Sequence, residues 1–274
     1  MAARPPSRPE RAAALADVAG FVFDLDGCVW QGERLNPGAA ETLAALHGGG
    51  RGVAYLTNNS RARGADISAK LRRLGVTPTE PALTPLEILG SVIAERYGPS
   101  RVLVIGSAEL AAVVTAAGHT LVDVARWREA TVVAVGNDFD LTYERLTAAS
   151  RAAAGGAPLL TPNVDPRLPL EDGDFLPGCG AIVAAVTAAA GVAPIVVGKP
   201  EPPLFRMALR RLGVSAATAA MVGDSVTSDV AGARAVGMRT VLYAPEGAPP
   251  DSADVVVRSF DELARLAGVG AAAR

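Results

Sequence analysis

The chain is poor in cysteine, histidine and lysine. Its 274 residues include two cysteines, Cys28 and Cys179, and two histidines, His47 and His119. These counts exclude a disulfide framework, a cysteine-based zinc cluster and a multi-histidine metal site. The 26 basic and 28 acidic residues nearly balance, so general binding of nucleic acid is not expected. Carboxylates, hydroxyls and the few lysines must therefore carry most of the chemistry.

A secretory leader and a membrane span are also missing from the pattern. Met1–Arg11 carries three arginines and three prolines but no apolar run, so residues 1–14 are expected to form a disordered tail. The uncharged stretch Ala181–Gly198 has the length of a membrane helix, but Gly191 and Pro194 interrupt it. It is predicted to form a helix, a turn and a short strand. We therefore expect a soluble, cytoplasmic protein.

Short apolar runs alternate with helical patterns towards both ends of the chain. Half of the residues are hydrophobic, and the length allows about two domains. The alternation is typical of a doubly wound, Rossmann-like parallel α/β sheet. Four runs stop at a polar cluster, as strands do when a site lies at their carboxyl ends: Phe21–Phe23, Val53–Leu56, Ile195–Val197 and Ala220–Val222. Helices are expected at Ala39–Leu46, Gly64–Leu74, Pro203–Leu212 and Ser228–Ala235, and further strands at Thr240–Tyr243 and Asp254–Val257.

The middle of the chain repeats this alternation by itself. Strands are expected at Val102–Ile105, Val132–Val135 and Pro158–Leu160, with helices at Ala108–Ala117 and Tyr143–Ala154. The sequence therefore predicts a smaller α/β domain over residues 83–190, inserted into an outer domain made of residues 15–82 and 191–274.

Two aspartates follow the first apolar run, in Phe21-Val22-Phe23-Asp24-Leu25-Asp26-Gly27. Carboxylates at positions i and i+2 past a strand end can point the same way, and side by side they repel unless a cation joins them. Mg²⁺ is a hard cation that prefers oxygen ligands and suits such a pair. An acidic turn after a strand explains the same pattern, so this motif alone leaves both interpretations open.

A hydroxyl and two amides follow the second run, in Leu56-Thr57-Asn58-Asn59-Ser60. The Thr57 hydroxyl and successive backbone N–H groups near a helix start could cradle an oxyanion. A helix N-cap with an Asx-turn is the alternative.

The third and fourth runs precede Lys199 and Asp224. A compact ammonium at Lys199 would neutralise clustered carboxylates and a phosphoryl group. The other lysine, Lys70, lies on a polar helical face and is expected to be solvated. Asp224 is a candidate metal ligand. Asp229 lies in the next helical turn, where complementing the helix dipole is the alternative.

In this order, each at a strand end, the four motifs resemble those of the haloacid dehalogenase-like (HAD) hydrolase superfamily, over about residues 18–267. The segments Thr161–Asp165, Leu176–Gly180 and Gly198–Pro202 resemble the IIA subfamily. That subfamily includes NagD-like, 4-nitrophenyl phosphate, phosphoglycolate, glycerol-3-phosphate and pyridoxal-phosphate phosphatases. The resemblance implies a HAD core with an inserted α/β cap domain.

The resemblance implies a role for each matching residue. Asp24 matches the nucleophile that forms an aspartyl-phosphate, and Asp26 matches the general acid–base. Mg²⁺ would be held by Asp24, the Asp26 carbonyl and Asp224, with Asp229 supporting the metal's ligands. The matched phosphate-binding positions are Thr57, Asn58, Asn59 and Lys199.

The resemblance also implies a class of substrate. A cap favours small phosphorylated metabolites, such as sugar, polyol (glycerol 3-phosphate) or glycolate phosphates. Leu168 stands where pyridoxal-phosphate phosphatases commonly have histidine, which argues against that substrate, and this segment is closer to the glycerol-phosphate type. Arg167 could bind a second anionic group of the substrate, and the alternative is that its side chain is simply solvated at the surface. The cap positions expected to set specificity are Asn163, Asp165, Arg167, Leu168 and Gly178.

Two other functions stay open. A phosphotransferase or mutase would use an alcohol in place of water, and a pseudophosphatase would bind phosphate without turnover. The intact Asp24, Asp26, Lys199 and Asp224 speak against the second. The expected partner is a small phosphorylated metabolite, with neither nucleic acid nor membrane. A homodimer is a further option, because capped members often dimerise.

Overall fold

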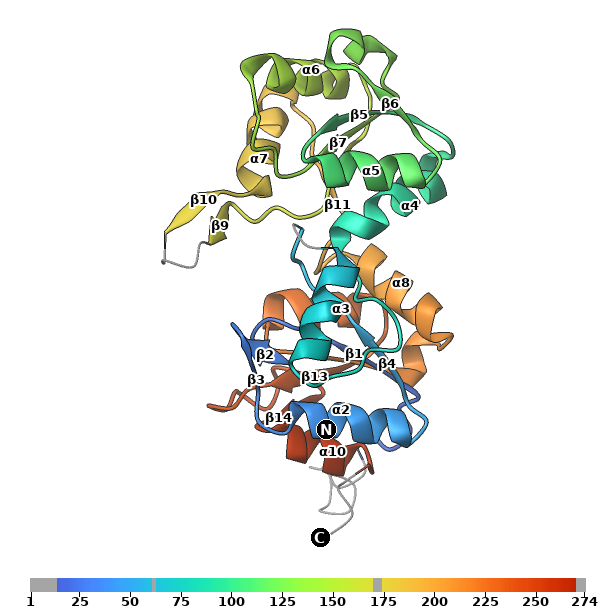
Figure 1. Ribbon diagram of the computed structural model, residues 1–274, viewed down its shortest axis with the longest axis vertical. Coiled ribbons are helices and arrows are strands. Elements are labelled where there is room, and N and C mark those ends of the chain that lie inside the picture. The colour runs from blue at the N-terminus through green and yellow to red at the C-terminus, as the bar shows by residue number, and fades with distance from the viewer. Residues whose placement is uncertain (1–13, 61–62, 170–173, 270–274) are drawn as a thin grey trace, which may run out of the picture. The chain divides into compact units, whose positions relative to one another are not determined.

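The computed structural model describes residues 14–60, 63–169 and 174–269. The expected N-terminal tail, apart from Ala14, lies outside the described residues. The chain forms two compact units (Figure 1). Unit 1 comprises the described residues of Met1–Thr57, Gly64–Leu83 and Phe205–Arg274, and unit 2 comprises those of Asn58–Arg63 and Thr84–Leu204.

Unit 1 is built on a parallel sheet with the strand order β14-β13-β12-β1-β4. The chain leaves the inner strand β1 for β4 on one side and later returns to β12 on the other. In such sheets, ligands bind at the carboxyl ends of the strands where the winding direction changes. The expected doubly wound parallel sheet is confirmed. Its strands are β1 (Gly20–Phe23), β4 (Gly52–Tyr55), β12 (Ala219–Gly223), β13 (Arg239–Tyr243) and β14 (Val255–Val257).

Helices and a small hairpin surround this sheet. The helix expected over Ser228–Ala235 begins instead with a π turn, a form that is frequent at functional sites. Helices α2 and α10 pack beside each other although they lie at opposite ends of the sequence (Figure 1). The elements are β2 (Trp30–Gln31), β3 (Arg34–Leu35), α2 (Ala39–Gly48), α3 (Gly64–Arg73), α8 (Pro202–Leu212), η2 (Ala216–Thr218), η3 (Val226–Val230), α9 (Ala231–Ala235) and α10 (Phe260–Leu266).

An aromatic cluster anchors the carboxyl end of β1. The Phe23 ring lies 6.3 Å from Phe21, 6.4 Å from Tyr55 and 6.3 Å from Phe260, and Tyr243 lies 5.2 Å from Phe260. Aromatic pairs at these separations add to the stability that burial supplies. Because Phe23 immediately precedes Asp24, this cluster also fixes where the strand delivers its first aspartate.

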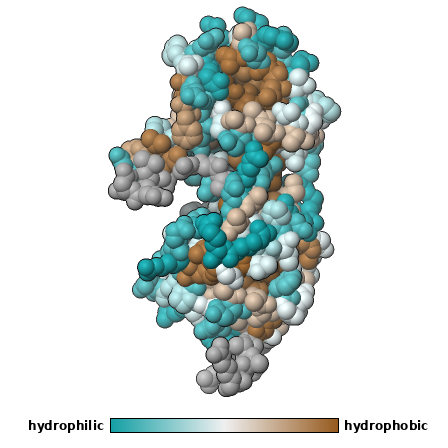
Figure 2. All heavy atoms as spheres, in the orientation of Figure 1, coloured by the Kyte–Doolittle hydropathy of each residue, from teal (hydrophilic) through white to brown (hydrophobic). Residues whose placement is uncertain are grey.

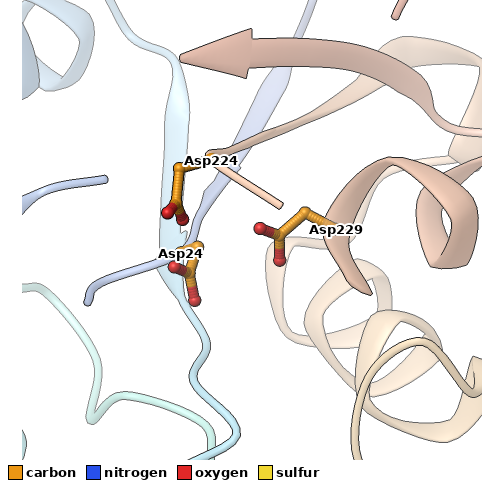
Figure 3. A group of neighbouring side chains, drawn as sticks. All are labelled: Asp24, Asp224 and Asp229. Atoms are coloured by element: carbon orange, nitrogen blue, oxygen red, sulfur yellow. The ribbon is translucent and has the colours of Figure 1, made fainter. Parts of the chain in front are cut away.

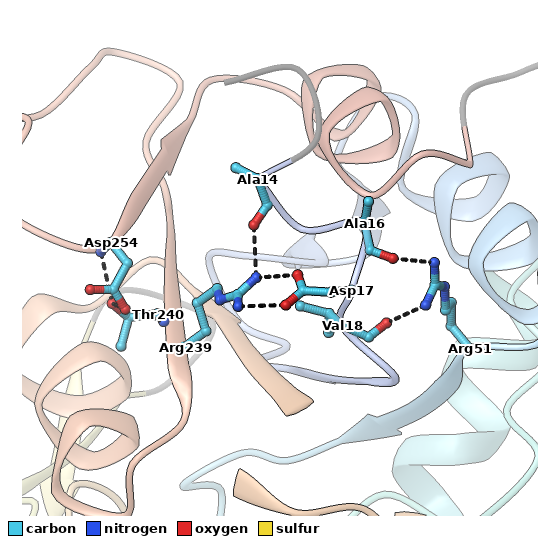
Figure 4. A network of polar contacts seen from close by, with 8 residues as sticks. All are labelled: Ala14, Ala16, Asp17, Val18, Arg51, Arg239, Thr240 and Asp254. Carbon is cyan, nitrogen blue, oxygen red and sulfur yellow. Dashed lines mark hydrogen bonds and ion pairs between the residues drawn. The ribbon is translucent and has the colours of Figure 1, made fainter. Parts of the chain in front are cut away.

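The segment before β1 is fastened by two arginines (Figure 4). Arg239 of β13 makes two hydrogen bonds to the Asp17 carboxylate, at 2.7 and 3.0 Å, and this hydrogen bonding lowers the pKa of Asp17. Arg51 donates to the carbonyls of Ala16 and Val18 at 2.6 and 2.7 Å. These planar guanidinium groups satisfy carbonyls that no strand pairs.

Unit 2 has its own five-stranded parallel sheet, in the order β11-β8-β7-β5-β6. The expectation that the run Ile195–Val197 joins the sheet of β1 is wrong, because Ile195 and Val196 pair with Leu160 and Thr161 of β8. Lys199 therefore follows a strand of the second sheet. The strands are β5 (Arg101–Ile105), β6 (Thr120–Val122), β7 (Val132–Val135), β8 (Leu159–Thr161) and β11 (Ile195–Val196).

The helices of unit 2 cover both faces of this sheet. Helices α4 and α5 pack together, as do α6 and α7 (Figure 1). The core between the sheet and the second pair is built from valine, leucine, isoleucine and alanine side chains together with Cys179. Hydrophobic atoms gather over the strands between α6 and α5 (Figure 2), and Leu121 of the edge strand β6 is 43% exposed. The helical elements are α4 (Pro85–Tyr97), α5 (Ala108–Ala116), η1 (Val124–Glu129), α6 (Tyr143–Ala154) and α7 (Cys179–Ala190).

A hairpin precedes α7, formed by β9 (Arg167–Pro169) and β10 (Phe175–Pro177). The uncharged stretch that ends at Gly198 forms most of α7, a turn and β11, as the sequence predicts. Among the described residues, no helix combines the length and hydrophobicity that crossing a membrane needs.

Candidate active site

Three carboxylates meet at the carboxyl edge of the sheet in unit 1. Asp24 follows β1, Asp224 follows β12 and Asp229 lies in η3, and all three point toward a common centre (Figure 3). One oxygen of each lies within 4.8 Å of the others. Asp24 and Asp229 are 6% and 1% exposed. The parallel register of β1 and β12 therefore delivers residues 200 positions apart to one point.

Two glycines allow the carboxylates to come this close. Gly27 has φ +90°, and a Cβ there would lie 2.3 Å from Asp224 Oδ2. A Cβ at Gly223 would lie 2.2 Å from Asp229 Oδ2. Both spaces are too small for any side chain, so the acidic cluster sits in a cradle that only glycine can line.

Asp26 lies beside this cluster but is not one of the three. Its Oδ1 accepts a hydrogen bond from Trp30 Nε1 at 2.7 Å, and its Oδ2 lies 3.5 Å from Thr57 Oγ1. Thr57 is 3% exposed, and its N–H donates to the Leu83 carbonyl at 3.1 Å. The structure thus brings Asp24, Asp26, Thr57 and the other two aspartates together in unit 1.

The remaining phosphate-binding candidates belong to unit 2. Asn58 Oδ1 accepts from the Lys199 backbone N–H at 2.7 Å, and Asn58 Nδ2 donates to the Lys199 carbonyl at 2.8 Å. Both functional groups of the Asn58 side chain are therefore used to hold the main chain at Lys199. Asn59 is exposed. Because α3 begins at Gly64, the segment from Thr57 to Ser60 precedes that helix rather than forming its first turn.

The candidate specificity residues of unit 2 differ in exposure and in the contacts that they make. Asn163 is 5% exposed and donates to the Asn58 carbonyl at 3.0 Å, so it fixes the same loop. Arg167 is exposed, and its guanidinium lies 4.3 Å from the centre of the Phe175 ring across the hairpin. A Cβ at Gly178 would lie 2.4 Å from the Asp165 carbonyl, so this glycine lets the loop approach α7.

Family models match both ends of the chain. One described as haloacid dehalogenase-like hydrolase covers residues 21–120, and one described as HAD-hydrolase-like covers residues 196–263. Glycerol-3-phosphate phosphatase of Homo sapiens is 35% identical over 261 residues, which are 85% of this chain and 81% of the relative. This chain belongs to the haloacid dehalogenase-like hydrolases. It is a phosphatase of the subfamily IIA type.

Solved structures agree with this HAD phosphatase in fold. The 4-nitrophenylphosphatase of Thermotoga maritima superposes with a TM-score of 0.80 at 30% identity, covering 92% of this chain and 98% of that one. A glycerol phosphate phosphatase of Mycobacterium tuberculosis, solved in complex with magnesium, gives 0.79 at 30% identity, covering 95% and 82%. The match over nearly the whole chain includes both units.

The acidic cluster of this HAD phosphatase fits a hard divalent cation. Three carboxylate oxygens within 4.8 Å of one another would repel strongly when two of the groups are buried. All of the side-chain atoms that could bind a metal here are carboxylate oxygens, and Mg²⁺ prefers oxygen ligands. Asp229 offers its side chain directly to this cluster, where the sequence placed it in a supporting role.

The cysteines of the phosphatase lie apart from this chemistry. Cys28 is fully buried, and its Sγ lies 3.7 Å from the Val222 carbonyl. Cys179 is 1% exposed, and burial raises the pKa of its thiol. A thiol held in its neutral form inside a core is a poor nucleophile.

Two contacts of the HAD phosphatase site were not foreseen from the sequence. The spacing of Trp30 from Asp26 carries no known signal for an indole hydrogen bond to a carboxylate. Lys70, expected to be solvated, is 21% exposed and binds Glu33 at 2.9 Å. Both contacts depend on the fold of the short hairpin β2–β3, which local periodicity does not predict.

Proposed function

We propose that this phosphatase hydrolyses small phosphomonoesters of sugars, polyols such as glycerol 3-phosphate, or glycolate, through an aspartyl-phosphate. The observation that carries the proposal is the gathering of Asp24, Asp224 and Asp229 at the switch point of the parallel sheet, with Asp26 beside them. The names of the human and Thermotoga relatives support the same class of reaction.

In the first step, Asp24 attacks phosphorus. A carboxylate is ionised at neutral pH because its ordinary pKa is about 3.9, so no activating base is required. The new bond joins an Asp24 oxygen to phosphorus, and the ester P–O bond breaks. Asp26 donates a proton to the departing alkoxide oxygen, which leaves as an alcohol.

In the second step, water hydrolyses the aspartyl-phosphate. Asp26, now ionised, takes a proton from the water whose oxygen attacks phosphorus. The bond between phosphorus and Asp24 breaks, and inorganic phosphate departs. The carboxylate of Asp24 and the proton on Asp26 are thereby restored, so the cycle balances.

The residues that would hold Mg²⁺ are Asp24, Asp224 and the Asp26 carbonyl, with Asp229 close enough to take part. When bound, the ion neutralises negative charge shared by the carboxylates and the phosphoryl group. The glycines at 27 and 223 keep this space clear of side chains.

Phosphate binding is assigned to Thr57, backbone N–H groups of Asn58 and Asn59, and the Lys199 ammonium. The Asn58 amide is committed to the Lys199 main chain, so its side chain positions the loop rather than contacting phosphate. The ammonium of Lys199 supplies positive charge against a phosphoryl dianion. These roles, the boundaries of the inserted cap and the homodimer stay predictions.

The test is release of inorganic phosphate from a panel of esters by the full chain with Mg²⁺. We expect turnover of 4-nitrophenyl phosphate and of at least one ester among glycerol 3-phosphate, phosphoglycolate and sugar phosphates. Transfer of phosphate to an added alcohol without release of phosphate would instead identify a phosphotransferase or mutase. Binding without turnover of any ester would identify a pseudophosphatase and contradict the proposal.

Specificity is assigned to strand β9 of the hairpin, which carries Arg167 and Leu168. Replacing Arg167 with alanine removes an exposed cation that could bind a second anionic group. Leu168→Ala shortens the apolar side chain at the position that pairs with Leu176 across the hairpin. We expect at least one of the two variants to change the ratio of kcat/KM between two esters of the panel by about 10-fold. Arg128→Ala is the matched control, because Arg128 also lies 4.3 Å from an aromatic ring, that of Trp127. Unchanged ratios in both the Arg167→Ala and the Leu168→Ala variant would contradict the assignment.

A further inference from the structure

The Asp26 carboxylate has two unequal oxygens. The indole N–H of Trp30 donates to Oδ1 at 2.7 Å, a short hydrogen bond. Oδ2 has the Thr57 hydroxyl at 3.5 Å, the outer limit of such a bond. The indole therefore fixes Oδ1, whereas Oδ2 is the oxygen better placed to carry the proton that Asp26 transfers to the leaving group.

Trp30 is itself held in a fixed position. It opens β2 and is 3% exposed. Its backbone N–H donates to the Leu25 carbonyl at 3.0 Å, and its carbonyl accepts from Gly27 N–H at 2.8 Å. The main chain around Trp30 is thus tied to both sides of Asp26, which fixes the direction from which the indole approaches.

Lys70 of α3 secures the hairpin that carries this indole. Its Nζ lies 4.6 Å from the centre of the Trp30 ring, donates to the Gly32 carbonyl at 2.8 Å and pairs with Glu33 Oε1 at 2.9 Å. The hydrogen bond from Lys70 lowers the pKa of the Glu33 carboxyl group. The Lys70 ammonium therefore contacts both the turn of the β2–β3 hairpin and the face of the Trp30 indole.

The charge of Lys70 also acts on the indole. A cation over an aromatic face is attracted by the negative charge of that face, most strongly for tryptophan. The same positive charge draws electron density from the ring and strengthens its N–H as a donor. Lys70 thus contacts the face of the Trp30 indole, and Asp26 accepts the hydrogen bond from its edge.

We propose that Trp30 and Lys70 are positioning residues for the acid–base step. The Trp30 N–H orients the Asp26 carboxylate so that Oδ2 faces the reacting oxygen, and Lys70 keeps the indole in that position. This inference rests on the proposed function, because it takes Asp26 as the acid–base residue.

Orientation matters here because the terminal torsion of aspartate is broad. Without a partner on one oxygen, the carboxylate samples many angles about its last bond. Misplacement of a reacting group by about 1 Å can cost about 100-fold in rate. A loss of orientation should slow only those reactions that need proton transfer to the leaving group.

The test compares two aryl phosphates of similar shape in the variant Trp30→Phe. Phenolate is about as basic as a tyrosine side chain, with a pKa of about 10, and needs protonation when it leaves, whereas 4-nitrophenolate is a much weaker base. In single-turnover experiments with enzyme in excess, we expect cleavage of phenyl phosphate to slow by about 10- to 100-fold. Cleavage of 4-nitrophenyl phosphate should change by less than about threefold.

The chain offers matched controls for both residues. Trp127→Phe removes the chain's other tryptophan, which lies in unit 2, and should leave both rates unchanged. Lys70 lies outside the buried core. Lys70→Met should also slow phenyl phosphate more than 4-nitrophenyl phosphate, but by a smaller factor than Trp30→Phe. Lys70→Arg should restore wild-type selectivity, because a guanidinium can also stack on the ring and donate to the carbonyl. Arg73→Met removes a charge from the same helix, 3.9 Å from Glu33, and should have no selective effect.

The outcomes separate this inference from the proposed function. If Asp26→Asn slows phenyl phosphate selectively but Trp30→Phe and Lys70→Met slow both esters equally or neither, positioning by the indole is rejected and the role of Asp26 stands. If Asp26→Asn itself shows no selectivity, the acid–base role fails. Should Trp30→Phe not fold, Lys70→Met and Lys70→Arg decide the matter.

Discussion

Asp24→Asn is expected to lower turnover of every ester by at least about 10⁴-fold, because loss of the nucleophile removes the covalent route as a whole. An amide is nearly the same size as a carboxylate, so the variant should keep its place beside Asp224 and Asp229. Its nitrogen and neutral oxygen cannot form an acyl phosphate at a useful rate. The measurement is the burst of nitrophenol from 4-nitrophenyl phosphate, together with acid-stable phosphoenzyme, and neither should be seen.

Asp26→Asn supplies the contrast for this experiment. It keeps the backbone carbonyl assigned to the metal but cannot give or take a proton. We expect a burst of nitrophenol, since that leaving group needs little protonation, followed by slow turnover because water is no longer activated. Asp66→Asn, an exposed aspartate of α3, serves as the neutral control. A normal burst from Asp24→Asn would reject Asp24 as the nucleophile.

Removal of divalent metal is expected to abolish turnover, and Mg²⁺ to restore it. The physical reason is the gathering of Asp24, Asp224 and Asp229, whose oxygens lie within 4.8 Å of one another and repel without a cation. Mn²⁺ should substitute for Mg²⁺, whereas Ca²⁺ prefers longer bonds and more ligands and should inhibit. Phosphate release after chelation and after addition of each ion is the measurement.

A binding experiment makes this prediction independent of catalysis. An ion that binds only the folded chain raises its unfolding temperature, so Mg²⁺ should shift the melting curve of the wild type. Asp224→Asn removes one of the three carboxylates and should reduce that shift, whereas Asp66→Asn should not. Full activity in excess chelator, with no melting shift on addition of Mg²⁺, would contradict the assignment of the cluster as a metal site.

The positions of the strand-end aspartates were predictable because their signals are local. Phe21–Phe23 and Ala220–Val222 are short apolar runs that stop at a carboxylate, and a buried parallel strand must end where its apolar residues end. Both became strands, β1 and β12, within one residue of the expected bounds. That Asp24 and Asp224 lie together was implied by the resemblance to the HAD family, and the parallel pairing of β1 with β12 brings them to one edge.

The partner of the run at Ile195 was not predictable from its own residues. An apolar strand can pair with any open edge, and the choice depends on which neighbours the remaining chain provides. In the structure this run pairs with β8 and carries Lys199 into unit 2. The sequence placed it in the outer sheet because its polar ending looked like that of β1.

The sequence by itself determined the α/β alternation, the glycine beside each crowded carboxylate and the strand ends that present Asp24, Asp26 and Asp224. Each of these depends on near neighbours in the chain, through burial and backbone conformation. Only the tertiary structure decided that Asp229 joins the cluster, that Trp30 donates to Asp26 and that Lys70 lies over the Trp30 ring. Those contacts arise when a hairpin, a helix and a strand end converge, and the direction of a single side chain is set by that packing rather than by its own sequence.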